Sequence, residues 1–245
     1  MSAWDRPSSV ASSQAGTLDQ GLRSYMLSVY NYMASGVLLT GIIAYFAGTS
    51  EQFLSLVLTQ GANGVGIAPL GYIIMFAPIV LVMLLGFRAR TMSTEGIQMA
   101  FWAYAALMGL SLFSIFLVYT QTSILRVFFV TAATFGLLSI YGYTTKKDLT
   151  SWRSFLIVGV WAVLLTTIVN MFLQSSPLQL MLSYVGVVLA LGLTAYDTQK
   201  VKEIYYGNRG SADGLKRSSI LGALTLYFDF IYLFINLLRI MGDRR

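Results

Sequence analysis

Two acidic residues inside apolar stretches are the part of this sequence that could do chemistry. Asp229 lies in the middle of the apolar run 220–240, and Asp197 lies at the end of the run 178–196. A carboxylate at the centre of a membrane helix costs roughly 2.5–3.5 kcal/mol even on the most lenient insertion scale, so both residues are functional candidates. Two neighbouring carboxyl groups cannot both ionise cheaply. Such a pair would share one proton at low pH and would offer Ca²⁺ an anionic oxygen site at higher pH.

Each acid also has a plainer role open to it. Asp197 could be an interfacial residue that is solvated beside Lys200 and Lys202, and Asp229 could be an anchor hydrogen-bonded to a Tyr or Asn side chain. The pair also requires that the two residues meet. Asp229 lies about 14 Å along its helix from Ile220, at a rise of 1.5 Å per residue. We therefore expect contact only if the sixth helix continues past Asp197 or if the helices tilt.

A basic residue at a similar depth could control access to this pair. Arg88 ends the second apolar run, on the side where Asp197 is expected. A salt bridge between Arg88 and Asp197 could close the cytoplasmic mouth of a pathway, and Arg90 could take the same role. The alternative is an arginine that sets the topology while its side chain extends along the membrane surface to water.

The composition requires membrane helices to position these side chains. The chain has 245 residues, of which 56% are hydrophobic and only 11% charged, and its mean hydropathy is +0.70. Because a soluble domain has roughly 25% charged residues, much of this surface must face lipid. Runs of about 17–25 apolar residues are long enough to span a bilayer. The seven runs cover approximately residues 26–46, 70–87, 99–119, 127–143, 155–173, 178–196 and 220–240.

These runs predict an all-α polytopic membrane protein. Residues 1–24 are expected to form a mobile polar cytoplasmic tail, and residues 25–242 one seven-helix membrane domain. Connections rich in Lys and Arg, around residues 88–90, 146–153 and 200–217, alternate with connections that have none or one. The positive-inside rule therefore places the N-terminus in the cytoplasm. We expect the last run to cross the membrane, although a re-entrant segment would keep Arg244 and Arg245 inside.

The residue types that are absent exclude several functions. The chain has no Cys and no His, so thiol nucleophiles, imidazole bases and zinc protease sites are excluded. The net charge of +6 comes from residues that punctuate apolar runs, which argues against nucleic-acid binding. Asp197 and Asp229 also lack the Gly-x-Gly-Asp context by which a chain would resemble the intramembrane aspartyl proteases. We therefore expect no enzymatic activity and no tightly bound cofactor.

Four blocks of sequence resemble the transmembrane Bax inhibitor motif family, in particular its bacterial branch. The blocks lie within residues 23–34, 195–200, 223–230 and 233–239, and the resemblance covers roughly residues 20–242. It implies six helices around a central seventh, a bacterial inner-membrane location and a pH-sensitive Ca²⁺ leak. The paired aspartates of that family match Asp197 and Asp229, and its latching arginine best matches Arg88. Eukaryotic members are linked to suppression of cell death and some bacterial members to a membrane-bound AAA protease.

Two functions therefore remain open. The first is a Ca²⁺ leak channel or transporter gated by protonation of Asp197 and Asp229, whose partners are the lipid bilayer, Ca²⁺ and protons. The second is a non-conducting membrane regulator of a partner, such as a membrane-bound protease or a cell-death or stress factor, in which the aspartates only organise packing.

Overall fold

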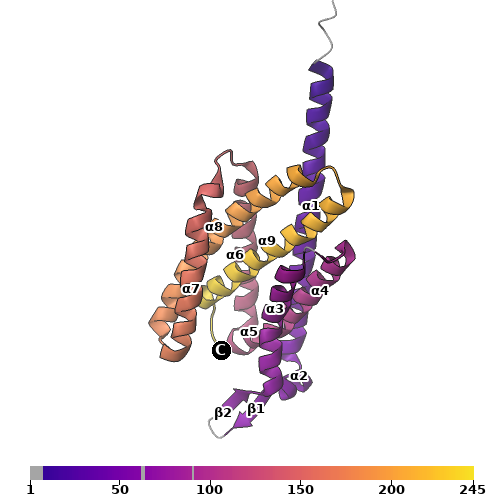
Figure 1. The fold of residues 1–245 in the computed structure, drawn as a ribbon. Coiled ribbons are helices and arrows are strands. Elements are labelled where there is room, and N and C mark those ends of the chain that lie inside the picture. The colour runs from indigo at the N-terminus through magenta and orange to yellow at the C-terminus, as the bar shows by residue number, and fades with distance from the viewer. Residues whose placement is uncertain (1–7, 62–63, 90) are drawn as a thin grey trace, which may run out of the picture.

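The described residues of the computed structural model, 8–61, 64–89 and 91–245, lie almost entirely in helices (Figure 1). Seven helical segments are long and apolar enough to cross a membrane, which confirms the predicted fold class. The elements are α1 (Ser8–Thr49), α2 (Glu51–Val57), β1 (Leu58–Gly61), β2 (Gly64–Ile67), α3 (Pro69–Arg88), α4 (Thr94–Ser111), α5 (Phe113–Val118), α6 (Gln121–Thr144), η1 (Leu149–Trp152), α7 (Arg153–Leu173), α8 (Ser176–Asn208) and α9 (Ala212–Met241).

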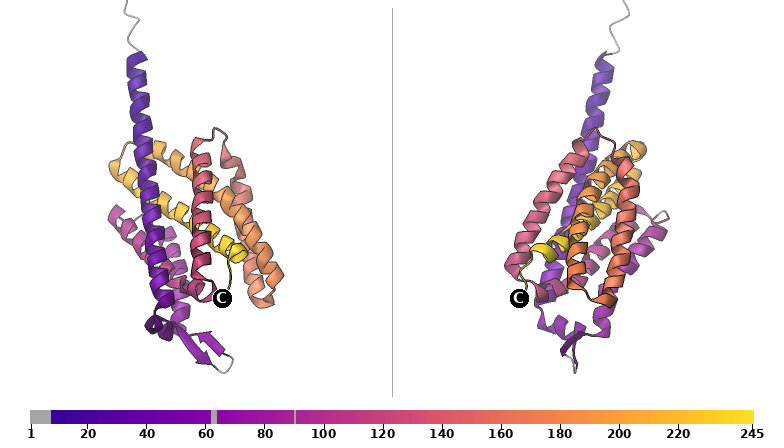
Figure 2. Two further views of the ribbon diagram at one scale, coloured as in Figure 1. Left: turned by 180° about the vertical axis from the view of Figure 1, so that it is seen from behind. Right: turned by 90° about the vertical axis from the view of Figure 1, so that its left-hand side faces the viewer.

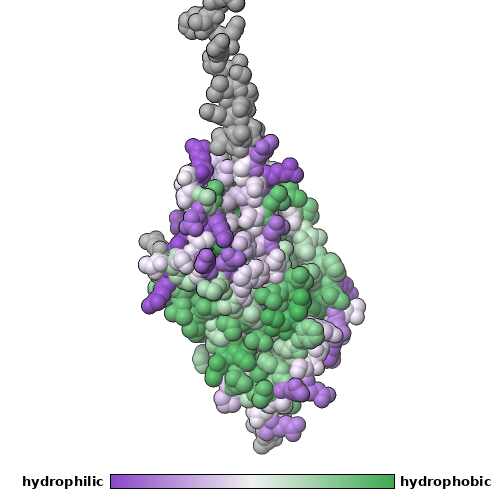
Figure 3. Space-filling model, turned by 90° about the vertical axis from the view of Figure 1, so that its right-hand side faces the viewer, coloured by the Kyte–Doolittle hydropathy of each residue, from purple (hydrophilic) through white to green (hydrophobic). Residues whose placement is uncertain are grey.

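On the face shown in Figure 3, an apolar band lies across the middle of the molecule between two polar ends. Large apolar side chains of the spans are exposed, as for Phe155 on α7 and Phe76 on α3. In the most apolar window of α7 only 6% of the residues are buried. Such a surface is stable only where lipid replaces water, so the chain is an integral membrane protein.

The last helix, α9, is the most buried of the seven spans. In its most apolar window 67% of the residues are buried, more than in any other of the seven spans. It packs against α1, α4, α6 and α8, whereas α3 makes its main contacts with α4, and α7 with α8. Four of the six other spans thus flank α9, and two form an outer layer.

Buried hydroxyl groups and close helix contacts fix the position of α9. The Thr40 hydroxyl of α1 donates to the Ala105 carbonyl of α4 at 2.8 Å, and it lies 2.7 Å from the Tyr227 hydroxyl of α9. Since Thr40 has already donated its proton, Tyr227 is the donor in the second bond. A Cβ on Gly186 of α8 would lie 2.6 Å from Asn236 Oδ1 of α9, so any other residue at position 186 would require the Asn236 side chain to move.

The connections gather at two ends of the bundle (Figures 1 and 2). The start of α1 lies at one end with the α3–α4, α6–α7 and α8–α9 connections; we call this the N-terminal end. The C-terminus lies at the other end, so α9 crosses the bundle as the sequence predicts. The 47–69 connection, also at that end, contains α2 and the antiparallel pair β1–β2. That the N-terminal end faces the cytoplasm stays a prediction from the loop charges.

The first helix begins before the apolar run that predicts it. It extends back to Ser8, so most of the segment 1–24 expected to form a tail is helical and continuous with the first span. Residues 1–7 lie outside the described residues. The mobility of the segment stays a prediction.

Candidate functional site

The helix that carries Asp197 continues well beyond it. α8 ends at Asn208, about 16 Å further along the helix axis. Its packing on α9 fixes the depth of both acids, since a Cβ on Gly222 would lie 3.1 Å from both methyl groups of Val201. Asp197 lies about one helical turn inward from Val201, and Asp229 lies about two turns inward from Gly222. Asp229 is therefore about one turn deeper in the bundle than Asp197. The sixth helix therefore continues past Asp197, which is the condition stated above for contact between the two acids.

The Asp197 and Asp229 side chains lie close enough to interact with each other. A carboxylate has no donor of its own, so a hydrogen bond between them would need one proton held between the two groups. Asp229 is only 5% exposed, and among the described residues no donor reaches its Oδ2 atom. The Tyr or Asn anchor that the sequence left open is not found for Asp229 among these residues, which leaves Asp197 as its polar neighbour.

A polar cavity leads from the N-terminal end of the bundle to Asp197. Its volume is about 370 Å³, and it lies between α8 and the first half of α9. Lys200, Arg217 and Thr225 line it together with Asp197, whereas Asp229 does not. An ion or a proton that enters here meets Asp197 first and Asp229 behind it.

Arg217 lines the cavity and also reaches the α3–α4 connection. This half-buried residue belongs to α9, and its guanidinium donates to the backbone carbonyls of Ala89 and Met92 in the α3–α4 connection. Ala89 is the C-cap of α3, where carbonyl groups have no partner within the helix and carry partial negative charge. The bonds therefore tie the α3–α4 connection to α9 at a residue that lines the cavity. Sequence reasoning grouped Arg217 with the loop cations, and backbone carbonyls leave no signature by which to find this role.

Arg88, the residue predicted to latch the mouth, is not paired with Asp197 in this structure. Arg88 is the last residue of α3 and is exposed, and it forms no ion pair with Asp197 or with another described carboxylate. Arg90 lies outside the described residues. A latch between Arg88 and Asp197 stays a prediction, and it would require the Arg88 side chain to turn inward.

Residues just beyond Asp197 attach α8 to its neighbours. The Gln199 amide donates to the Lys147 carbonyl at 2.9 Å and accepts from the Leu149 N–H at 2.8 Å, both in the α6–α7 connection. Lys202 donates to the Tyr143 carbonyl of α6 at 2.8 Å. Three polar contacts thus hold the segment of α8 that follows Asp197, so this part of the cavity wall is well fixed.

The donor atoms at the site are all oxygen. Among the described residues no cluster of three or more His, Cys, Asp or Glu side chains could hold a metal ion. The two carboxyl groups are of the kind that Ca²⁺ prefers, but Ca²⁺ takes about 6–8 oxygen ligands. Water and the Thr225 hydroxyl in the cavity would have to supply part of the rest. Such a site suits an ion that passes through better than one that is retained.

Comparison with known proteins agrees with the motif blocks. The family model described as "Inhibitor of apoptosis-promoting Bax1" matches residues 22–245. An uncharacterized protein of Rickettsia prowazekii is 45% identical, with 94% of this chain and 93% of the relative covered. The inner membrane protein YbhL of Escherichia coli K12 is 42% identical over 92% of this chain and 94% of its own. The matched region holds all seven spans and both aspartates, and the chain belongs to the Bax1 inhibitor family.

Proposed function

We propose that this protein is a pH-sensitive leak pathway for Ca²⁺ in a bacterial inner membrane. The inner-membrane location is carried over from the printed name of the YbhL relative. The observation that carries the activity is the buried Asp229 carboxyl, whose Oδ2 has no donor and which faces Asp197 at the inner end of a polar cavity. The proposal assigns no catalytic step and no tightly bound cofactor.

The pair would respond to both protons and Ca²⁺. Two negative charges in a site of low dielectric constant repel each other strongly, and either a proton or a divalent cation relieves the repulsion. Protonation should therefore weaken Ca²⁺ binding, and Ca²⁺ should favour release of the shared proton, since such coupling is reciprocal. The cavity beside Asp197 gives both ions a route from the N-terminal end.

Opening would require two changes. At the N-terminal end, the α3–α4 connection must leave Arg217. Beyond Asp229, α9 is sealed by an apolar cluster that includes Val127, Phe234 and Leu238. The described residues thus represent a closed state of the proposed pathway.

Flux measurements with matched variants test this proposal. Purified protein in liposomes would be assayed for Ca²⁺ flux between pH 6 and 8, as wild type, Asp229→Asn, Asp197→Asn and Asp213→Asn. Asp213 is an exposed acid in the first turn of α9 and serves as the control. We expect Asp229→Asn to lower Ca²⁺ binding and the pH dependence, Asp197→Asn to leak at neutral pH, and Asp213→Asn to match wild type.

The sealed half of α9 favours one alternative. If the apolar cluster around Phe234 never opens, the protein is a non-conducting regulator of a membrane partner, such as a membrane-bound protease or a stress factor. Flux no greater than that of empty liposomes at every pH, with folded protein, would select this function. Flux with a pH dependence unchanged in Asp197→Asn and Asp229→Asn would instead leave the aspartates as packing residues.

A further inference from the structure

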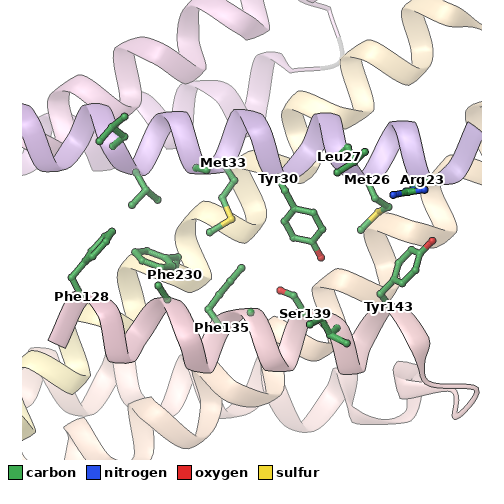
Figure 4. A pocket seen from close by; sticks show the side chains of 16 residues that line it. Arg23, Met26, Leu27, Tyr30, Met33, Phe128, Phe135, Ser139, Tyr143 and Phe230 are labelled. Carbon is green, nitrogen blue, oxygen red and sulfur yellow. The ribbon is translucent and has the colours of Figure 1, made fainter. Parts of the chain in front are cut away.

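The ring of helices around α9 has a lateral gap. α1 and α6 both pack against α9 but scarcely against each other. A cavity of about 790 Å³ lies between them, with Met33 and Tyr30 of α1 on one wall, Phe128 and Phe135 of α6 on the other, and Phe230 of α9 at its floor (Figure 4). The gap therefore gives the bilayer access to the central helix.

This cavity continues toward the C-terminal end. A second cavity of about 390 Å³ shares Val37, Leu38, Phe128 and Phe230 with the first and reaches Phe46. Together the two follow α1 from Arg23 to Phe46, about 35 Å at 1.5 Å per residue. A bilayer has a hydrocarbon core of about 30 Å, so the groove extends through its full thickness.

The groove is apolar and faces lipid. Its rims are exposed, with Leu27 at 53%, Leu38 at 64% and Ile140 at 62% of their accessible surface. Water in a site lined by Leu, Ile, Met and Phe side chains would lack hydrogen-bonding partners. In the membrane this groove is therefore filled by hydrocarbon.

One end of the groove is basic. Arg23 and Tyr143 lie together at the N-terminal end of the first cavity (Figure 4). The Lys202 ammonium lies 5.3 Å from the centre of the Tyr143 ring. Among residues 20–60, 64–89 and 91–245, whose side chains the structure describes, no carboxylate forms an ion pair with Arg23. A guanidinium binds a phosphate through two parallel hydrogen bonds, so this end has the chemistry of a phospholipid head-group site.

The order of charged and apolar groups decides between a lipid chain and a helix. The first cavity follows α1 from Arg23 to Leu38, about 22 Å, with a guanidinium at one end and apolar side chains along the rest. A phospholipid has the same order, an anionic phosphate followed by an apolar chain. We propose that the groove between α1 and α6 binds an acyl chain of a phospholipid from the leaflet at the N-terminal end, with the lipid phosphate on Arg23.

A glycine in the groove provides a selective test. Gly136 of α6 lines the first cavity, and a Cβ added there would meet nothing within 4 Å. Gly136→Leu therefore adds a side chain at the groove wall whose Cβ meets no other atom. Gly86 of α3 lies outside the groove and also has nothing within 4 Å of an added Cβ, so Gly86→Leu is the matched control.

The measurement is phospholipid retained per chain, by native mass spectrometry of protein extracted from bilayers of phosphatidylethanolamine and phosphatidylglycerol. Wild type and Gly86→Leu should each retain one phospholipid. Gly136→Leu should lower the affinity at least about tenfold. Arg23→Gln should lower retention of phospholipid but not of diacylglycerol, which has the same chains and no phosphate; inorganic phosphate alone should not be retained.

Two results would overturn the site. One is equal retention by wild type and Gly136→Leu; the other is a wild-type chain without lipid that forms a dimer which Gly136→Leu disrupts, because a second copy would then fill the groove. If Gly136→Leu does not fold, the Arg23→Gln comparison of phospholipid with diacylglycerol decides. None of these measurements depends on Ca²⁺ flux.

Discussion

An arginine contact holds each end of helix α9, but one contact is half-buried and the other is exposed to water. At the N-terminal end, half-buried Arg217 donates to the carbonyls of Ala89 and Met92 beside the Asp197 cavity. At the C-terminal end, Arg126 of α6 forms a salt bridge with Asp243, and the two side chains are 54% and 66% exposed. One contact is a pair of charge-assisted bonds to backbone, and the other is an ion pair in water.

The C-terminal end has a second means of attachment. The residues after α9 return to the start of α6, where the Thr120 N–H donates to the Asp243 carbonyl at 3.0 Å and the Asp243 N–H donates to the Ser123 hydroxyl at 2.9 Å. The Arg245 N–H also donates to the Val118 carbonyl at 3.0 Å. Backbone bonds thus fix this end whatever the salt bridge does. At the N-terminal end, the described hydrogen bonds between α9 and the α3–α4 connection come from the single side chain of Arg217, so we expect this end to be the one that opens.

Replacing Arg217 should have the largest effect. Arg217→Ala should lower the free energy of unfolding by about 3 kcal/mol, because hydrogen bonds to a charged group contribute about 1.5–3 kcal/mol each and the carbonyls lose both. The chain has no cysteine, so spin labels at Thr91→Cys and Asp213→Cys report the distance between the connection and α9 without background. We expect that distance to lengthen and broaden, and Ca²⁺ leak at neutral pH to rise. Arg209→Ala, at an exposed position, is the control.

In Arg217→Ala, the spin-label distance and the Ca²⁺ leak test different parts of the proposal. A longer distance without Ca²⁺ leak would support the attachment of the connection by Arg217 and count against conduction. An unchanged distance and an unchanged stability would show that the bonds from Arg217 do not hold the connection.

A lysine at position 217 sharpens the comparison, with a smaller effect. Arg217→Lys keeps the charge, but a single ammonium lacks the planar fork by which a guanidinium serves two acceptors at once. One of the two carbonyls should lose its donor, at a cost of about 1.5 kcal/mol. The unfolding curve and the spin-label distance should therefore fall between those of wild type and Arg217→Ala. If lysine restored wild-type values, charge alone would account for the contact.

The sequence predicts the seven spans, because each span follows from a pattern within a single segment. It leaves the meeting of Asp197 with Asp229 conditional on whether the sixth helix continues past Asp197 or the helices tilt. The sequence pattern also indicates that α8 continues past Asp197. Val201 and Tyr205 follow Asp197 at spacings of four and are 2% and 5% exposed, so the helical period persists where the hydropathy falls. Apolar runs alone place the end of such a helix too early, because they do not take the helical spacing of buried residues into account.

Other features have no local signature. Arg217 binds backbone carbonyls, which every residue type supplies, and no spacing in the chain identifies them. Arg88 ends an apolar run as a latch would, yet its exposure depends on where α3 ends relative to α9. The lateral groove arises because α1 and α6 fail to touch, and neither helix's own pattern encodes the absence of a neighbour.

The smallest effect is expected at the C-terminal end. Asp243→Asn removes the charge from the exposed pair with Arg126 but leaves the backbone bonds at position 243 in place, so the loss should be below about 1 kcal/mol. Because exposed charges are screened within a Debye length of about 3 Å at 1 M salt, wild type should lose the same increment when salt is raised from about 0.05 to 1 M, and Asp243→Asn should not. Thermal unfolding in detergent at both salt concentrations measures this. The increment lost by Arg217→Ala should persist at high salt, since its bonds to neutral carbonyls are half-buried. Equal salt sensitivity at the two ends would remove the distinction on which the proposed opening at the N-terminal end depends.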